Sequence, residues 1–343
     1  MTHSIKHLTI KRQLLYLTLV CTLFWIIGCK KNDPPPAPVL TITTVATGLV
    51  SPIGMDADRE GNVWVAQAGT GKNDGKVSII TTSGQKFDAI IGLESFITDI
   101  GEVEGPSHLL FTEGRLFILG AHGKMYKANV NSFRPGNIPL AASTLAVEDI
   151  GAFVLGYNFV NNAHDTHPYG ITKGPDDAIY IADAAANAII KRSRSGVLTV
   201  LAEVPGIPNP LPYGPPQIQS VPTGVIYDGQ NFLVTAFLGF PFPAGKSLIY
   251  KISRAGAVSV YQQGFTSLVD LAEGSYYGHL VLEHGVFGAT GFTPNTGKLK
   301  WANGVASNEL TTGLNLPAGL LQTNLHTWYV TSLGDNSVLK ISY

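Results

Sequence analysis

The segment from Asn161 to His167 holds the densest group of polar side chains in the chain. Its sequence, NNAHDTH, places His164 beside Asp165 and His167 three residues after the first histidine. Histidine and carboxylate side chains brought together can bind a divalent cation or activate a water molecule. His164 and His167 are therefore candidate catalytic bases, and Asp165 is a candidate ligand-binding residue. A solvated loop is the alternative, because the spacing of the two histidines puts both rings on one side only in a helix.

Further candidates emerge from an internal repeat. A phrase of Pro-x-Gly type recurs at intervals of roughly 50 residues, each time at the start of an apolar strand. The copies are Pro52-Ile53-Gly54, Pro106-Ser107-His108, Pro168-Tyr169-Gly170, Pro222-Thr223-Gly224, Leu268-Val269-Asp270 and Pro317-Ala318-Gly319. His108 and Asp270 replace the usual glycine, which suggests contact with a ligand near the mouth of a channel. Local turn capping is the alternative interpretation.

The residues that follow the second strand of each repeat supply two more carboxylates, Asp183 and Glu283. Asp183 is also the ordinary turn residue expected there, whereas Glu283 has less turn propensity and lies beside His284. The sequence thus predicts a ligand-binding set of His108, Asp165, Asp183, Asp270, Glu283 and His284. Within this set, Asp183, Asp270 and Glu283 are the candidate ligands of one divalent cation.

The elements that must position these side chains are short strands. The chain is 45% hydrophobic and only 14% charged, with 38 Gly and 21 Pro, which favours an all-β fold. Repeats of this length predict a six-bladed β-propeller of four-stranded blades. The strand from Leu40 to Val45 precedes the first repeat and is expected to complete the last blade, closing the ring. Residues 40–343 are therefore expected to form one domain.

The first residues are expected to direct export. Basic residues precede an apolar run from Leu14 to Ile27, which is typical of a signal peptide in residues 1–28. The run ends in IIGC, which resembles the lipobox of bacterial lipoproteins and predicts lipidation of Cys29. An ordinary signal peptide with a chance cysteine is the alternative. Residues 29–39 include PPPAP, a stiff tether that would hold the domain away from a membrane.

Composition excludes several functions. Removal of the signal peptide takes away Lys6, Lys11 and Arg12 and leaves an acidic excess without a basic stripe, so nucleic acid is not an expected partner. The only cysteine besides Cys29 is Cys21, inside the signal, so the mature chain has no thiol nucleophile. Two proline-rich insertions, at 205–216 and 239–243, could instead wall a pocket or cover blade edges.

Seven phrases along the chain resemble the ScyD/ScyE family, which is related to NHL-type propellers. They are VATGLVSPIG (45–54), GNVWVAQAGTG (61–71), EGPSHLLF (104–111), THPYGI (166–171), VPTGV (221–225), FLGFPFPAGKSLIYKI (237–252) and GFTSLVDLAEG (264–274). The resemblance spans nearly all of the expected mature chain. It implies an exported six-bladed propeller, and it carries over no catalytic residues.

The leading hypothesis is an exported propeller, anchored in the bacterial cell envelope by lipid on Cys29. It would bind a small molecule, a glycan or a protein at its loop-rich face, and it is more simply a binding or scaffold protein than an enzyme. A metal-assisted hydrolase of lactonase type is the first alternative, with the cation held by the carboxylates named above. A structural envelope protein is the second.

Overall fold

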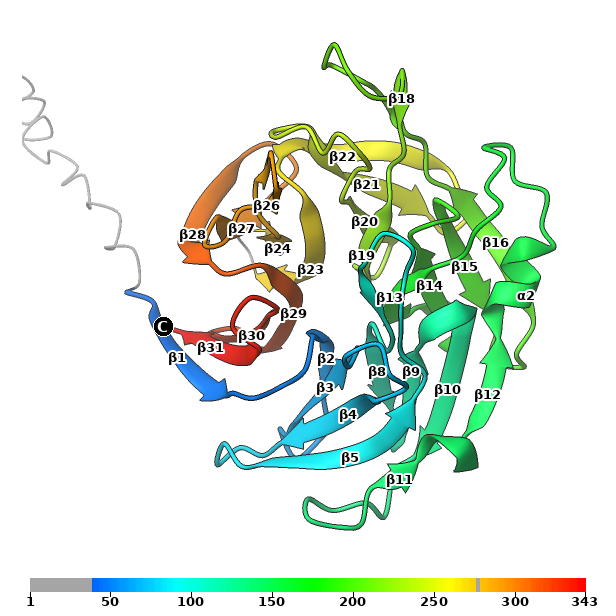
Figure 1. The fold of residues 1–343 in the computed structure, drawn as a ribbon. Coiled ribbons are helices and arrows are strands. Elements are labelled where there is room, and N and C mark those ends of the chain that lie inside the picture. The colour runs from blue at the N-terminus through cyan, green and yellow to red at the C-terminus, as the bar shows by residue number, and fades with distance from the viewer. Residues whose placement is uncertain (1–38, 276–277) are drawn as a thin grey trace, which may run out of the picture. The chain divides into compact units, whose positions relative to one another are not determined.

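Six antiparallel sheets surround a central axis (Figure 1) in the structure, a computed structural model that describes residues 39–275 and 278–343. The first three blades are β2 (Pro52–Ala57), β3 (Val63–Gln67), β4 (Gly75–Ile80) and β5 (Lys86–Leu93); β8 (Leu109–Thr112), β9 (Arg115–Leu119), β10 (Lys124–Asn129) and β12 (Ala146–Asp149); and β13 (Pro168–Lys173), β14 (Ile179–Asp183), β15 (Ala188–Arg192) and β16 (Leu198–Glu203).

The other three blades complete the ring. They are β19 (Pro222–Tyr227), β20 (Asn231–Ala236), β21 (Ser247–Ser253) and β22 (Val258–Phe265); β23 (Leu268–Ser275), β24 (Gly278–Glu283), β27 (Gly297–Ala302) and β28 (Ser307–Leu314); and β29 (Pro317–Asn324), β30 (Thr327–Ser332), β31 (Ser337–Ser342) and β1 (Thr41–Ala46). The all-β, six-bladed prediction is confirmed. A short strand, β11 (Leu140–Ala141), adds to β5 of the first blade in parallel orientation.

Apolar side chains between neighbouring sheets hold the blades together. The second strand of each blade is nearly all buried; every residue of β3, for example, is enclosed. Trp64 of β3 stacks on Phe111 of β8, with ring centroids 6.4 Å apart. Strands that are buried on both faces lose the usual alternation of apolar and polar residues, which explains the continuous apolar runs of the second strands.

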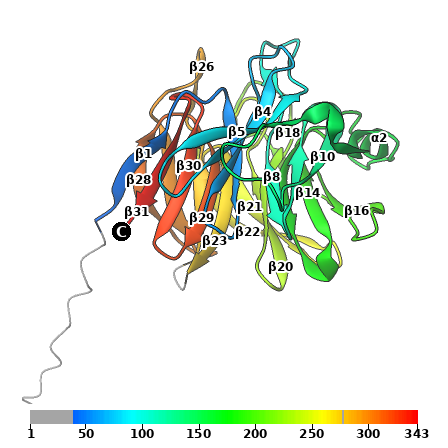
Figure 2. The ribbon, with the colours of Figure 1, turned by 90° about the horizontal axis from the view of Figure 1, so that it is seen from below.

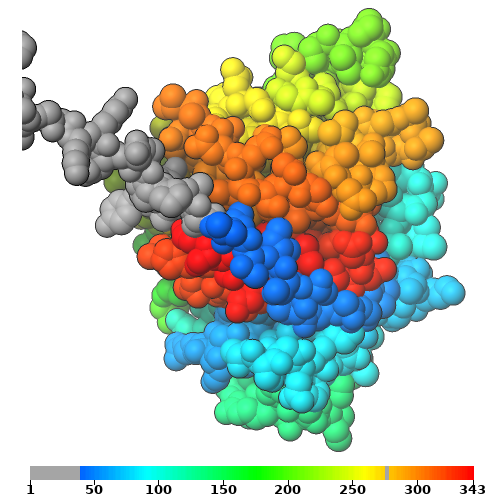
Figure 3. Space-filling model, turned by 90° about the vertical axis from the view of Figure 1, so that its left-hand side faces the viewer, coloured from blue at the N-terminus to red at the C-terminus, as the bar shows by residue number. Residues whose placement is uncertain are grey.

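The ring is closed by its two ends. β1 pairs antiparallel with β31, with Thr41 opposite Ser342 and Ala46 opposite Val338. The space-filling view shows β1 lying against the C-terminal blade (Figure 3). Ala46 and Leu49 continue this contact into a buried cluster with Val338. The predicted closure by the N-terminal strand is therefore confirmed, and it covers the edge that β31 would otherwise expose.

Most long insertions leave the propeller on the same face, here called the loop face (Figure 2). Because the first two strands of a blade are antiparallel, the start of the first lies beside the end of the second, as Pro52 lies opposite Gln67. The insertions on this face contain β6 (Phe96–Ile97), β7 (Val103–Glu104), η1 (Ala121–Gly123), α2 (Ile150–Leu155), β17 (Ile207–Pro208), β18 (Gln217–Ile218), β25 (Phe287–Gly288) and β26 (Gly291–Phe292).

The opposite face, here called the tether face, carries mostly short hairpins. One of them includes η3 (Pro175–Asp177), and β1 begins on this face because Thr41 lies opposite Ser342 and Ser342 lies opposite Thr327. A further turn, η2 (Ala142–Thr144), lies between β11 and β12 at the outer edge. The predicted signal peptide, Cys29 and the tether up to residue 38 lie outside the described residues. Within the described residues, no helix is long and apolar enough to span a membrane.

The closure predicts a sharp difference between two truncations. Removing residues 1–46 deletes β1 and exposes the edge of β31, whereas removing residues 1–39 leaves the closed ring intact. We expect the first truncation to lower the melting temperature by about 10 °C or more and to promote association through the open edge. Circular dichroism melting and light scattering measure both effects. Equal melting temperatures for the two truncations would contradict the closure.

Candidate functional site

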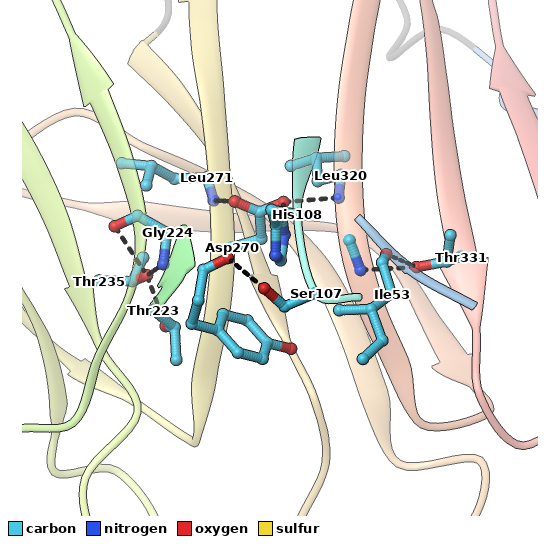
Figure 4. Close-up of polar contacts among 12 residues, drawn as sticks. Ile53, Ser107, His108, Thr223, Gly224, Thr235, Asp270, Leu271, Leu320 and Thr331 are labelled. Atoms are coloured by element: carbon cyan, nitrogen blue, oxygen red, sulfur yellow. Dashed lines mark hydrogen bonds and ion pairs between the residues drawn. The ribbon is translucent and has the colours of Figure 1, made fainter. Parts of the chain in front are cut away.

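His108 and Asp270 meet at the axis of the propeller (Figure 4). His108 directly precedes β8, the inner strand of the second blade, and Asp270 lies in β23, the inner strand of the fifth; these blades face one another across the ring. Nε2 of His108 lies 3.6 Å from Oδ2 of Asp270, and each residue is only 7% exposed. The sequence predicted that these two residues contact a ligand, and the structure shows that they contact one another.

Glycines on neighbouring blades make room for this pair. A Cβ atom on Gly54 would lie 2.5 Å from the ring of His108, and one on Gly224 would lie 2.7 Å from Oδ1 of Asp270. A side chain at either position would overlap with the pair or with its backbone. The repeat therefore has glycine beside the axis at these positions because the imidazole and the carboxylate occupy the space.

The two members of the pair differ in how well they are satisfied. Asp270 accepts hydrogen bonds from the backbone N–H of Leu271, at 2.8 Å, and from that of Leu320 in the sixth blade, at 2.7 Å. Neither ring nitrogen of His108 has a hydrogen-bond partner among the described residues. The ring packs instead against Tyr169, with centroids 4.8 Å apart, and burial together with the nearby Asp270 raises the pKa of the Tyr169 phenol well above its usual range.

Hydroxyl groups link the inner strands around the axis (Figure 4). Ser107 donates to the carbonyl of Pro168 at 3.0 Å, and Thr223 donates to that of Leu268 at 3.1 Å. Thr331 of β30, in the sixth blade, donates to the carbonyl of Ile53 in the first blade at 2.6 Å. These bonds join successive blades, so the side chains at the axis serve the assembly of the ring.

Asp183 is a structural turn residue. Its carboxylate accepts the hydroxyl of Thr166 at 2.6 Å and the backbone N–H groups of His167 and Ala186 at 2.8 and 3.0 Å. Burial raises the pKa of this carboxyl, although the hydrogen bonds oppose that effect. The polar segment 161–167 thus contacts Asp183, and both oxygens of this buried carboxylate are used to hold the segment and the following turn in place.

Glu283 and His284 are also engaged. Glu283 accepts the backbone N–H of Thr266 at 2.9 Å and pairs with Lys300 at 3.0 Å. Nδ1 of His284 lies 2.8 Å from the carbonyl oxygen of Pro317, and burial lowers the pKa of its imidazole. The ring packs in a cluster of phenylalanines that includes Phe237 and Phe292.

The predicted cation ligands are therefore held apart. Asp183, Asp270 and Glu283 bond to three different sets of partners, and within the described residues no three His, Cys, Asp or Glu side chains are grouped as metal ligands would be. Asp183 belongs to the third blade, whereas Asp270 and Glu283 both belong to the fifth. Within the fifth blade, Asp270 lies beside His108 at the axis, and Glu283 bonds to Thr266 and Lys300.

The two candidate histidines point to different surroundings. Nδ1 of His167 lies 3.7 Å from Oε2 of Glu104, and its ring centroid is 6.0 Å from that of Tyr169. His164 and Asp165 instead line a cavity at the rim of the loop face, beside the outer strand of the third blade and between the segment that precedes this blade and the insertion that follows it. The structure thus divides the predicted site into an axial group and a rim group.

The rim cavity has a volume of about 990 Å³. Its polar lining is rich in amides and consists of Tyr157, Asn161, Asn162, His164, Asp165, Asn187, Glu203, Gln217 and Gln219. Among the described residues, no lysine or arginine lines it. Glu203 fixes the loop by accepting the backbone N–H groups of Val160 and Asn161 at 2.9 and 3.1 Å. Gln217, Gln219 and His164 remain exposed to the cavity.

The sequence analysis missed the glutamines and the tyrosine of this cavity. Gln217 and Gln219 lie just after the proline-rich insertion at 205–216, where β17 and β18 form a small hairpin. The proline-rich composition of this insertion is the feature of the sequence that indicates a pocket wall here. Tyr157 packs on Phe159, with ring centroids 4.7 Å apart, at the end of α2. Nothing in the sequence showed that these two insertions face one another.

Comparison with known proteins supports the architecture. No protein-family model and no curated protein matches the chain. Among solved structures, it is similar to virginiamycin B lyase from Staphylococcus aureus, with 16% identity over 89% of this chain and 99% of that one and a TM-score of 0.51. It is also similar to a PQQ-bound aldose sugar dehydrogenase from Streptomyces coelicolor, with 14% identity over 90% and 99% of the two chains and a TM-score of 0.59.

A third similar structure is the PQQ domain of pyranose dehydrogenase from Coprinopsis cinerea, in its holo form. It shares 12% identity over 90% of this chain and 96% of that one, with a TM-score of 0.55. At these identities the similarity establishes a propeller fold and nothing about chemistry, because one fold supports many unrelated functions. Lyase and dehydrogenase activity belong to those proteins.

The hydrogen bonds of Asp270 predict a structural role that can be measured. Asp270→Ala should lower the free energy of unfolding by about 3 kcal/mol, because the N–H groups of Leu271 and Leu320 lose their acceptor in a buried place. Asp165→Ala, on the exposed part of the same face, is the control and should change it by less than about 0.5 kcal/mol. Urea unfolding gives both values. If the two variants unfold alike, the structural role of Asp270 is wrong.

Proposed function

We propose that this protein is an exported, lipid-anchored propeller that binds a neutral, hydroxyl-rich ligand of the glycan class in the rim cavity of its loop face. The observation that carries the proposal is the lining of that cavity. Amide side chains both donate and accept hydrogen bonds, as hydroxyl groups do. Lysine and arginine are absent from the described lining, so an anionic ligand would find no countercharge.

The shape of the cavity supports the same ligand class. A volume of about 990 Å³ lies at the upper end of the range usual for small-ligand pockets. Tyr157, which is 40% exposed, offers an apolar ring face at the edge, while Gln217 and Gln219 stand on the opposite hairpin. Glu203 and Asn187 are already bonded within the protein, so the loop is positioned before any ligand arrives.

Export and anchoring rest on the sequence. The apolar run before Cys29, the lipobox-like IIGC and the proline-rich tether support a lipoprotein of the bacterial cell envelope. The seven phrases shared with ScyD/ScyE proteins support membership of that group of propellers. β1 begins on the tether face, so anchoring there would leave the loop face free for a ligand.

The two alternatives differ in what supports them. The lactonase-type hydrolase keeps one favourable observation, the buried His108 beside Asp270, but the described carboxylates that would hold its cation are separated. A structural envelope protein would need neither the rim cavity nor exposed amides. Absence of any ligand for the rim cavity would favour that alternative.

Binding at the rim cavity can be tested with a panel of neutral oligosaccharides. NMR or calorimetric titration of the purified protein should identify a ligand, and Gln217→Ala combined with Gln219→Ala should weaken its binding at least fivefold, about 1 kcal/mol, through lost hydrogen bonds. Gln230→Ala, an exposed glutamine of the tether face, is the matched control and should leave binding unchanged. No binding by the panel, or equal effects of both sets of substitutions, would contradict the proposal.

Anchoring has a separate test. Cys29→Ala should move the protein from the membrane fraction to the soluble fraction or leave it as an unprocessed precursor, because the acylated side chain is missing. Fractionation and mass spectrometry of the mature N-terminus measure both outcomes. Normal maturation together with unchanged membrane retention would show that Cys29 is not the anchor.

A further inference from the structure

A second cavity lies on the tether face, between the second and third blades. Its volume is about 520 Å³, and it is formed where β8 turns into β9 and where β13 leads through η3 into β14. It is separate from the rim cavity, with which it shares no residue. Its lining contains lysine and arginine, which are absent from the described lining of the rim cavity.

Five cationic side chains line this cavity. They are Arg115, Lys127, Lys173, Arg192 and Arg194. In the sequence only Arg192 and Arg194 are close together, because the five residues are spread over four segments of two blades. Strand pairing and the contact between the blades bring them together.

Two carboxylates each neutralise two of these cations. Glu148 pairs with Lys127 at 2.7 Å and with Arg192 at 2.5 Å. Asp177 pairs with Lys173 at 2.7 Å and with Arg194 at 2.9 Å.

The balance of charge in the cavity is positive. One more carboxylate, Glu113, lies 3.7 Å from Lys173. The lining thus holds five cations and two carboxylates, Glu113 and Asp177, and Glu148 pairs with two of the cations from outside the lining. Arg115 is exposed and forms no ion pair with any described residue. An excess of cations in a concave site raises the local concentration of anions.

The guanidinium of Arg192 is fixed in place. It donates two hydrogen bonds to Glu148, and it lies over the ring of Phe117 at 5.9 Å from the centroid. The pKa of Glu148 falls to about 2, first because of its hydrogen bond from Arg192 and also because of Lys127. The wall of the cavity is thus ordered around a permanent ion pair, while Arg115 and Arg194 remain at its mouth.

We propose that this cavity is a binding site for a phosphate-bearing anion. Arginine suits such a ligand because its planar fork can donate two parallel hydrogen bonds to phosphate oxygens. Arg115 and Arg194 supply these forks, and the fixed Arg192 and Lys127 supply the positive potential behind them. The proposal does not depend on the function proposed for the loop face.

Two sources of phosphate fit this position. One is the headgroup of an anionic phospholipid, because the cavity opens on the face where β1 begins, and the anchor proposed above would bring that face toward a membrane. The other is a soluble phosphate compound. The chemistry of recognition is the same for both.

Calorimetric titration of the full-length protein with inorganic phosphate at low salt tests the site. Arg194→Glu should weaken binding at least tenfold. Its control is Arg254→Glu, because Arg254 occupies an equivalent exposed hairpin on the same face: Gly196 donates to the carbonyl of Ser193 at 2.9 Å, as Gly256 does to that of Ser253. Arg254 does not line the cavity and should have no effect on binding beyond that of net charge.

A second variant should act in the opposite direction. Asp177→Asn releases Lys173 and Arg194 from their carboxylate and should tighten phosphate binding severalfold. Asparagine tolerates the positive φ of 54° at this position, so the fold should be kept. Melting temperatures of all variants confirm folding. Lack of saturable phosphate binding, or equal weakening by Arg194→Glu and Arg254→Glu, would overturn the proposal.

Vesicles distinguish the two sources. Cosedimentation of the full-length Cys29→Ala protein is compared between phosphatidylcholine vesicles and vesicles that also contain phosphatidylglycerol. Retention on the anionic vesicles that is lost with Arg194→Glu but kept with Arg254→Glu assigns the site to a lipid headgroup. Phosphate binding without such a difference assigns it to a soluble phosphate compound.

Discussion

Closure of the ring by β1 and β31 is the constraint on which the rest of this structure depends. Each blade buries apolar side chains against its two neighbours, so no blade has a complete core by itself. The N-terminal strand pairs with the last strand of the chain and leaves no open edge at the junction. Once the six blades form a closed ring, successive strands of a blade run in opposite directions, so the connections between strands alternate between the two faces of the ring.

Closure of the ring leaves little space at the axis. Six inner strands converge there, and four of them have glycine at the closest approach. The remaining space is filled by His108 and Asp270 from opposite blades. Asp270 also accepts the backbone N–H of Leu320. A side chain that the sequence predicted to bind a ligand therefore joins the fifth and sixth blades. His108 is the exception, since its ring nitrogens have no partner among the described residues.

The two faces differ in chemistry as well as in loop length. The loop face has long insertions and a cavity lined by amides, without lysine or arginine in its described lining. The tether face has short hairpins and a cavity with an excess of cations. A propeller can present two such sites because its strands are rigid and its two sets of connections vary independently. A ligand on one face and an anionic surface on the other would not compete for space.

The sequence by itself determined the fold class, the number of blades, the closing strand and the face on which His108, Asp183, Asp270 and Glu283 would lie. These features follow from local patterns, because strand periodicity and repeat spacing are written along the chain. Export and lipidation are likewise indicated by local sequence, in residues beyond those described.

Only the tertiary structure decided which side chains meet. Asp183, Asp270 and Glu283 occupy equivalent or neighbouring positions of the repeat, yet each has its own partners, even though Asp270 and Glu283 belong to the same blade. The rim cavity arises between two insertions about 50 residues apart, and the cationic cavity gathers residues from four segments. Distances between such segments depend on how the blades pack around the axis, and no local pattern in the sequence records that packing.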